Sequence, residues 1–396
     1  MRFLSDIYKV WSFEFRNILR DSGVILFALI VPLAYPLLYA FIYNNETIRE
    51  VPVAVVDEAD SQLSRRFVRM LDATADVKVA ARALSMEEAE ELNRTGKTYG
   101  TIRIPAEFDK QLARGEQTTI GVYADMAGML YYKALMLSST NVSLELNKEI
   151  KAERFYTGAT DRQLEIAAQP VEYFDVALFN PKGGFAAFLL PAVLMLILQQ
   201  TLMLSIGMTG GETRERYAGR VLPPRPEFDN TLAVLLGKTL IYFPLYMIEA
   251  LYMFYFVSDL FTLPMLGSVV DYVLFMIPYI LSCIFMAITF SSFIFRREDC
   301  IMLYVFMSLP LLFISGISWP GTAVPEFWKV VSWIFPSTFA LNGYVRIHSM
   351  GATLSQVEPE FIGLWVQTIV YMVFAAIFYH KVARKAESER LATEDK

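Results

Sequence analysis

The segment FAAFLLPAVLMLILQQTLMLSIGM, Phe185–Met208, contains 24 residues and no charged side chain. A helix crosses the hydrocarbon core of a bilayer with about 20 apolar residues, so this segment predicts a membrane-spanning helix. Pro191 would break such a helix in water, whereas packed membrane helices tolerate proline. The chain is therefore expected to be a membrane protein.

Five further segments have the apolar character of a membrane span. They cover residues 24–43, 231–257, 272–295, 300–317 and 361–380. The segment 231–257 contains Lys238 and Glu249, and the segment 300–317 is short. The first segment is too long for a signal peptide and lacks a small-residue cleavage site after it, so we interpret it as an uncleaved anchor. We expect a polytopic α-helical membrane protein with six transmembrane helices.

Charged residues are distributed unevenly along the 396 residues. The chain is 55% hydrophobic and 19% charged overall, but residues 44–182 alone contain 22 acidic and 17 basic side chains. These 39 charges in 139 residues make that region 28% charged, against 14% for the rest of the chain. The region is therefore expected to be a water-soluble domain inserted between the first two spans.

Within 44–182, short β-rich segments alternate with segments of helical spacing. The expected strands are 51–56, 77–80, 99–104 and 119–124, and the expected helices include 61–71, a helix opened by the capping box Ser85-x-x-Glu88, and 129–155. This alternation is typical of a small α/β domain. No glycine-rich fingerprint follows the first strand, so a nucleotide pocket is not expected, and the acidic residues at the strand ends are interpreted as solvated turns and helix caps.

Lysine and arginine gather on one side of the expected membrane. The segments 1–22, 209–230, 296–297 and 381–396 hold 15 of these residues, whereas the short outer loops hold only Lys329 and Arg346. The excess of positive charge predicts that both termini are cytoplasmic, with a cytoplasmic tail at 381–396, and that 44–182 and 318–360 lie outside.

Residues 1–22 predict an amphipathic helix on the cytoplasmic membrane surface. One helical face is basic and polar, and the other consists of apolar side chains: Leu4, Ile7, Tyr8, Trp11, Phe15 and Ile18.

The sequence contains no recognisable ATP-binding or catalytic site. Gly237-Lys238-Thr239 resembles the end of a phosphate loop, but Leu232 stands where that loop needs glycine, and the triplet lies inside an apolar span. The net charge of −6 leaves no basic stripe for nucleic acid. We expect no cofactor on this chain, and the open classes are a transporter subunit driven by another protein, a receptor, or a membrane enzyme.

Two sets of motifs carry a family resemblance. GISWP (316–320), VPEFW (324–328) and FPSTFAL (335–341) precede the last span, while VAVVD (53–57), LSRR (63–66) and GTIRIPAEF (100–108) lie in the inserted domain. In this order they resemble ABC-2 type (type V) ABC exporter permeases with a large periplasmic domain between the first two spans. In that family the segment before the last span forms two short re-entrant helices at the outer face, which here corresponds to 318–360.

The resemblance implies how such a chain would be driven. The family places a coupling helix between spans two and three, which contacts a separate ATPase that binds ATP and magnesium. That region is 209–230 here, and the residues that match the family's charged run are Glu212, Arg214, Glu215 and Arg216. A charged loop that only anchors the topology is the alternative interpretation.

Polar residues inside spans are functional candidates because burying them in lipid is costly. In the family, spans two and five line a path between two permease copies, either identical or closely related. The candidates for this path are Gln199, Gln200, Glu249, Phe306 and Phe313. Hydrogen bonding between helices explains the glutamines equally well, and ordinary packing explains the phenylalanines.

The expected protein is thus an exporter permease of the bacterial inner membrane, with an unidentified cargo for which amphiphilic or drug-like compounds are candidates. A periplasmic adaptor for the external domain is left open. Two rivals are a four-span mechanotransmission permease, which has no spans between 230 and 295, and a membrane-anchored sensor that acts through its external domain.

Overall fold

The structure of the protein is a computed structural model that describes residues 2–394 except 44–46, 127, 156–177, 181–183, 218, 219, 221, 224 and 295. The chain divides into two compact units. One consists of residues 1–46 and 177–396, and the other of residues 47–176. We call them the helical unit and the α/β unit.

The α/β unit is built on a four-stranded sheet in the order β2-β1-β3-β4. Its strands are β1 (Val51–Asp57), β2 (Val77–Arg82), β3 (Gly100–Ile104) and β4 (Gly121–Ala124). β1 pairs in parallel with both β2 and β3, and β4 pairs antiparallel with β3. The four strands lie where alternation in the sequence predicts them, and β4 forms an edge of the sheet.

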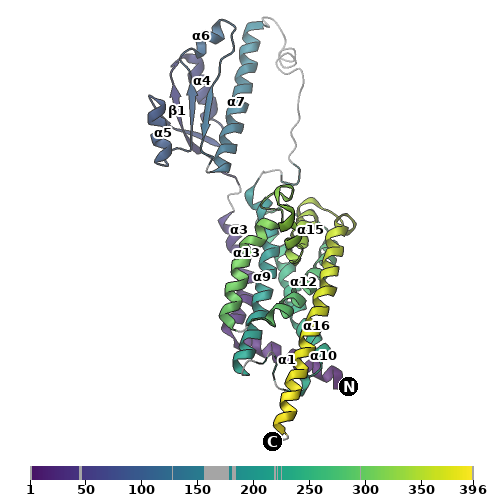
Figure 1. The fold of residues 1–396 in the computed structure, drawn as a ribbon. Coiled ribbons are helices and arrows are strands. Elements are labelled where there is room, and N and C mark those ends of the chain that lie inside the picture. Colours follow the sequence, from purple (N-terminus) through teal and green to yellow (C-terminus); the bar gives the residue numbers. More distant parts are fainter. Residues whose placement is uncertain are drawn as a thin grey trace. The chain divides into compact units, whose positions relative to one another are not determined.

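Helices cover both faces of this sheet (Figure 1). Alternate residues of β1 point to opposite faces: Val53 and Val55 join the core with α4 (Gln62–Asp72), α6 (Phe108–Ala113) and α7 (Met129–Phe155), whereas Ala54 and Val56 pack under α5 (Met86–Arg94). The unit therefore has three layers with a hydrophobic core on each side of the sheet.

The helix starts follow local capping. Ser61 caps α4 by accepting the Ser64 N–H at 3.0 Å, and Ser85 caps α5 by accepting the Glu88 N–H at 3.3 Å. The second bond of the expected capping box differs, because the Glu88 carboxylate accepts the Leu84 N–H instead of that of Ser85.

The helical unit contains the remaining elements, which Figure 1 shows as one bundle. They are α1 (Arg2–Arg20), α2 (Ser22–Ile25), the π-helical η1 (Leu26–Ile30), α3 (Val31–Ile42), α9 (Phe185–Arg216), η2 (Pro226–Phe228), α10 (Thr231–Leu251), the π-helical η3 (Tyr252–Val257), α11 (Ser258–Leu260), α12 (Val269–Ser291), α13 (Arg297–Ile314), η4 (Gly321–Ala323), α14 (Glu326–Ser332), α15 (Pro336–Met350), η5 (Leu354–Val357) and α16 (Glu358–Glu394).

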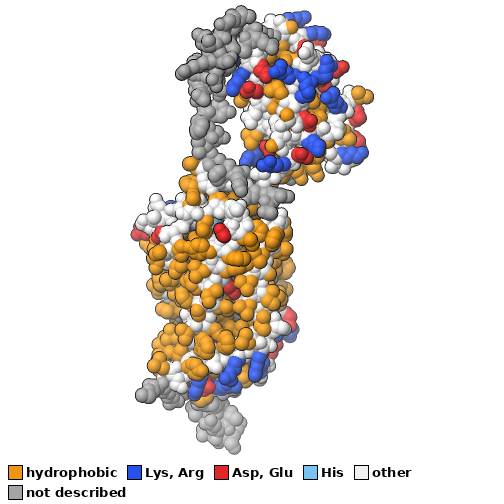
Figure 2. All heavy atoms as spheres, turned by 180° about the vertical axis from the view of Figure 1, so that it is seen from behind, with side chains coloured by type: hydrophobic (Ala, Val, Ile, Leu, Met, Phe, Trp, Pro, Cys, Tyr) orange, Lys and Arg blue, Asp and Glu red, His pale blue; other side chains and the backbone are white. Residues whose placement is uncertain are grey.

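Five helical stretches among the described residues are long and apolar enough to cross a membrane. They are Ser22–Ile42, Phe185–Arg216, Thr231–Leu260, Val269–Ser291 and Leu354–Lys381. Figure 2 shows the corresponding surface as an apolar girdle, with basic side chains gathered at one end. The chain is therefore a polytopic membrane protein, and two of these stretches occupy the region in which a four-span permease has none.

The sixth expected span, 300–317, corresponds to α13 and is not among the five. α13 begins with three charged residues, Arg297, Glu298 and Asp299. The uncharged part that follows, 300–314, would extend about 22 Å as a helix, which is less than the roughly 30 Å of a bilayer core. The six-span count therefore stays a prediction.

α9 is the central helix and is buried along most of its length, against α12, α13 and α15. The expected span ends at Met208, but the helix continues to Arg216, so residues 209–216 are helical rather than part of a loop. The reason is close packing: a Cβ on Gly211 would lie 3.1 Å from the Arg297 backbone nitrogen, so glycine lets the α12–α13 turn lie directly on this helix.

Candidate functional site

The charged run expected to couple the chain to an ATPase forms the last two turns of α9, at the end of the helical unit where both chain termini lie (Figure 1). Its four members lie in different environments. Glu215 and Arg216 are exposed, Glu212 is half-buried and forms an ion pair with Arg216 one turn away, and Arg214 is 6% exposed. A partner protein can therefore reach only part of the charged run.

Arg214 points into the bundle. Its guanidinium donates hydrogen bonds to the backbone carbonyl oxygens of Ser292 and Ile294, which belong to the turn after α12. Backbone carbonyls in such a turn lack helical partners, and a charged donor satisfies them strongly. Arg214 therefore fixes the end of α9 to the α12–α13 turn.

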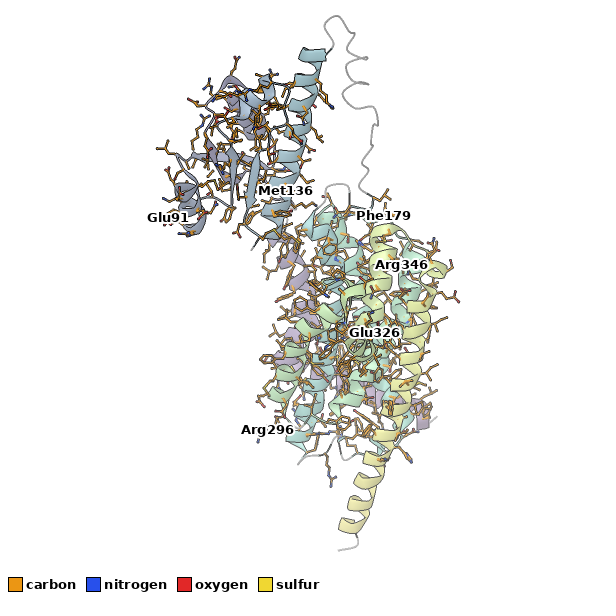
Figure 3. The ribbon with its side chains drawn as sticks, turned by 45° about the horizontal axis from the view of Figure 1, so that its top comes forward. Glu91, Met136, Phe179, Arg296, Glu326 and Arg346 are labelled. Atoms are coloured by element: carbon orange, nitrogen blue, oxygen red, sulfur yellow. The ribbon has the colours of Figure 1, made fainter. Side chains whose placement is uncertain are left out.

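A second link joins this end of α9 to the first helices of the chain. Arg297, at the start of α13, donates to the Asp21 carboxylate at 2.7 Å, and its backbone N–H lies 3.4 Å from Glu215 Oε1. The same Asp21 carboxylate caps α2 by accepting the N–H groups of Gly23 and Val24. One aspartate thus holds α2 and α13 together beside α9, near the position of Arg296 in Figure 3.

A third link is a buried ion pair between α1 and α10. Glu14 is 2% exposed, and its carboxylate pairs with the ammonium of Lys238, which is 5% exposed. The Tyr242 hydroxyl lies 3.5 Å from the other carboxylate oxygen. Gly237 permits the close approach, since a Cβ there would lie 2.7 Å from a Val10 methyl group. The triplet that resembles a phosphate loop is therefore a helix-packing site.

α1 contacts the bundle through four buried residues, Val10, Glu14, Asn17 and Ile18. Three residues of the apolar face that is expected on the membrane surface, Leu4, Tyr8 and Phe15, are exposed on this chain. The loop after α9 also covers α1: the Arg225 guanidinium lies 5.5 Å from the centre of the Phe13 ring, which packs edge-on against Phe228 at 5.3 Å. α1 is thus held by side chains on two sides.

The two glutamines of α9 have different surroundings. Gln199 is fully buried, and its side-chain oxygen accepts the Ser337 N–H at 2.7 Å, which caps the N-terminus of α15. Gln200 is 8% exposed, and neither its oxygen nor its nitrogen has a hydrogen-bond partner among the described residues. Hydrogen bonding between elements therefore accounts for the Gln199 oxygen, whereas the Gln199 nitrogen and both polar atoms of Gln200 have no partner among the described residues.

Gln200 lines a small cavity of about 140 Å³ between α9 and α13. The rest of the wall is apolar apart from the hydroxyl of Tyr304, which is also without a partner among the described residues. The cavity can accept an apolar group that carries a single hydrogen-bonding function.

The other three candidates also occupy distinct places. Phe306 and Phe313 are 76% and 53% exposed on α13, so they face lipid or another protein rather than this chain's interior. Glu249 is 2% exposed on α10, immediately before the π-helical η3, and neither carboxylate oxygen has a hydrogen-bond partner among the described residues. The structure does not bring Glu249 together with the charged run on α9.

Sequence reasoning did not single out Glu14, Asp21 or Arg297, and it noted Lys238 only as a charged residue in a span and as part of the triplet that resembles a phosphate loop. A usable signal exists for the buried pair: a lysine inside an apolar span needs an acidic partner, and Glu14 is an acid on the neighbouring amphipathic helix. The Asp21–Arg297 link has no such signal, because both residues lie outside the expected spans, where a charged side chain needs no buried partner.

Comparisons with known proteins agree with the membrane architecture. Residues 23–377 match the family described as "ABC-2 family transporter protein". The chain is 22% identical over 395 residues to "Inner membrane transport permease YhhJ" of Escherichia coli (strain K12), with 96% of this chain and 98% of that protein covered, and to the same degree to the protein of that name in Shigella flexneri. It is 20% identical over 368 residues to "ABC transporter G family member 20" of Dictyostelium discoideum, which covers 92% of this chain and 49% of that protein.

Proposed function

We infer the function from the premise that this chain belongs to the ABC-2 family of transporter proteins, whose members are permease components of ABC transporters. We propose that it is the permease subunit of an exporter of the bacterial inner membrane, with cytoplasmic termini, and that two copies enclose the path. A separate ATPase chain would bind ATP and magnesium and supply the energy.

The observation that carries this proposal is the way the end of α9 is tied to the rest of the bundle. Arg214 fixes it to the α12–α13 turn, and Arg297 ties that turn to Asp21 and α2. A displacement of the last turns of α9 would therefore move several spans together. Coupling between an ATPase and a transport path requires such a two-state element that both sites can bias.

The contacts divide the charged run into two roles. Glu215 and Arg216 are exposed and are our candidates for contact with the ATPase. Arg214 acts as a positioning residue, because its charge is directed into the bundle, and Glu212 orients Arg216 through their ion pair. Docking would thus use two side chains rather than four.

The path is proposed to run along α9 and α13. Gln200 and the apolar cavity beside it suit an amphiphilic cargo, because one buried amide can bind a polar group while the walls accept apolar ones. The exposed Phe306 and Phe313 would then face the second copy or the cargo. We propose no role in the path for Gln199, whose side chain caps α15.

The test is co-purification with a candidate ABC ATPase chain of the same organism, which is co-expressed with the permease. We expect the tagged permease to retain this ATPase in mild detergent, and the double charge reversal Glu215→Arg/Arg216→Glu to release it while the permease still elutes as a folded protein. The control is Glu326→Lys/Lys329→Glu on α14, which reverses an ion pair of 2.7 Å between an exposed glutamate and a half-buried lysine. Equal retention of the ATPase by both double variants would refute docking at α9.

A further inference from the structure

The α/β unit contains a hollow of about 610 Å³ between α7 and the chain that leads into β4. One wall is a single face of α7, on which Met136, Thr140, Ser143 and Asn147 recur at helical spacing. The opposite wall is formed by residues 115–120, and Met136 marks the α7 side in Figure 3. A volume of this size is within the range of small-molecule binding sites.

The floor of the hollow is apolar and fixed in position. It is formed by Phe67 from α4, Phe108 from α6 and Leu146 from α7, whose exposed fractions are 1%, 2% and 4%. These residues belong to the core between the sheet and its helices. The floor therefore does not need a ligand to form, and it offers an apolar surface of fixed shape.

Two hydroxyl groups in the walls have no hydrogen-bond partner among the described residues. Ser139 on α7 is 5% exposed and Thr118 lies on the opposite wall, and the oxygen of each is buried. A buried hydroxyl without a partner is destabilising, so such groups normally find one. A ligand in the hollow can supply that partner to both hydroxyls.

The charges of the residues that line the hollow indicate which class of ligand it can bind. None of the described residues that line the hollow is basic, and Glu116 is the one acidic residue among them. An anionic ligand would therefore enter without a counter-charge and would meet a carboxylate. Hydroxyl and amide groups from Ser139, Ser143 and Asn147 instead provide donors and acceptors for an uncharged polar group.

The geometry points to a binding site for an uncharged amphiphile of small-molecule size on the α/β unit. Its apolar part lies on the floor formed by Phe67, Phe108 and Leu146, and its polar group bonds to Ser139 on one side and Thr118 on the other. This site is separate from the α9–α13 cavity and does not depend on transport by the helical unit.

The probes are octyl glucoside, octyl sulfate and glucose, with octyl glucoside kept below its micelle concentration and the full-length protein in lipid nanodiscs. The two native cysteines, Cys283 and Cys300, are buried. A single Ser143→Cys variant therefore reports on the hollow through its rate of reaction with a water-soluble maleimide. Glu145→Cys on the same helix is the matched control, because Glu145 is exposed and does not line the hollow.

We expect octyl glucoside to slow labelling of Ser143→Cys saturably and to leave Glu145→Cys unchanged. Octyl sulfate, which has the same tail and a negative charge, should protect less, and glucose should not protect. Adding Ser139→Ala should raise the half-protecting concentration about fivefold, which corresponds to one lost hydrogen bond of about 1 kcal/mol.

Three results would overturn the site. Labelling of Ser143→Cys that is already slow without any probe would mean that protein covers the hollow. Labelling that no probe changes would mean that it holds only water. Equal protection at both cysteines would mean that the amphiphile acts through the lipid.

Discussion

Breaking the Glu14–Lys238 pair should destabilise the helical unit strongly, because neither charge can reach water. Their side chains are 2% and 6% exposed, and Lys238→Met leaves the Glu14 carboxylate buried with only the Tyr242 hydroxyl at 3.5 Å. Removing one partner of a buried pair typically costs about 3–5 kcal/mol. For a unit of this size, that corresponds to a decrease in Tm on the order of 10 °C.

Removing both charges should have a much smaller effect. A pair of apolar side chains of similar volume is often as stable as a buried ion pair, because no charge is left without a partner. We therefore expect Glu14→Leu/Lys238→Met to unfold within a few degrees of the unmodified protein, and Glu14→Leu alone to be nearly as unstable as Lys238→Met alone.

The assay is thermal unfolding in detergent, followed by the fraction of protein that still elutes as a monodisperse peak. The double-mutant cycle gives the coupling between the two positions. Our reasoning would be refuted if the two single variants caused small losses that simply add in the double variant, because this would mean that the charges do not depend on each other.

Four further predictions concern individual side chains. Gly237→Ala should lower thermal stability by about 1–3 kcal/mol, because the added methyl group overlaps α1, and the same unfolding assay would reveal it. Gln199→Leu should destabilise the bundle by about 1–3 kcal/mol, since an N–H of α15 loses its acceptor. Gln200→Leu should leave unfolding unchanged or improved, because its amide has no partner to lose, and it should alter only transport. In the α/β unit, the hydrogen bond from Arg103 at 2.8 Å lowers the pKa of Glu58. The pair's stabilising contribution is therefore present at pH 7 and is lost as the pH falls through the lowered pKa of Glu58, so Arg103→Gln should destabilise the unit slightly at pH 7 and less near pH 2. Hydrogen exchange of β1 and β3 at the two pH values measures this effect.

Local patterns predict much of the α/β unit. The four strands, the Ser85 cap and the full extent of α7 depend on residues that are close in sequence, and the structure has them at or within a few residues of the expected positions. The membrane character of the chain is likewise evident from composition, since burial in lipid requires long apolar segments.

Long-range pairing is what sequence patterns do not reveal. Lys238 meets Glu14 across 224 positions, and Arg214 meets the carbonyl of Ile294 across 80. All four charged residues on α9 can contact an ATPase only if all four are accessible. The sequence does not show that the Arg214 side chain points into the bundle, because its direction depends on where the α12–α13 turn packs.

α9 extends beyond the expected span for a related reason. The expected bounds follow the uncharged apolar segment, which ends just before Gly210 and Gly211, and glycine has low helix propensity. In the structure another segment packs directly against them, and the gain from that contact outweighs their low helix propensity.

The central claim is that a separate ATPase drives this permease through the exposed end of α9. The most direct measurement is ATP hydrolysis by the candidate ATPase, compared with and without the permease in nanodiscs. We predict that the unmodified permease and the Glu326→Lys/Lys329→Glu control change the rate of hydrolysis to the same extent, and that Glu215→Arg/Arg216→Glu abolishes this effect while remaining folded. An unchanged effect in the Glu215→Arg/Arg216→Glu variant would contradict the account.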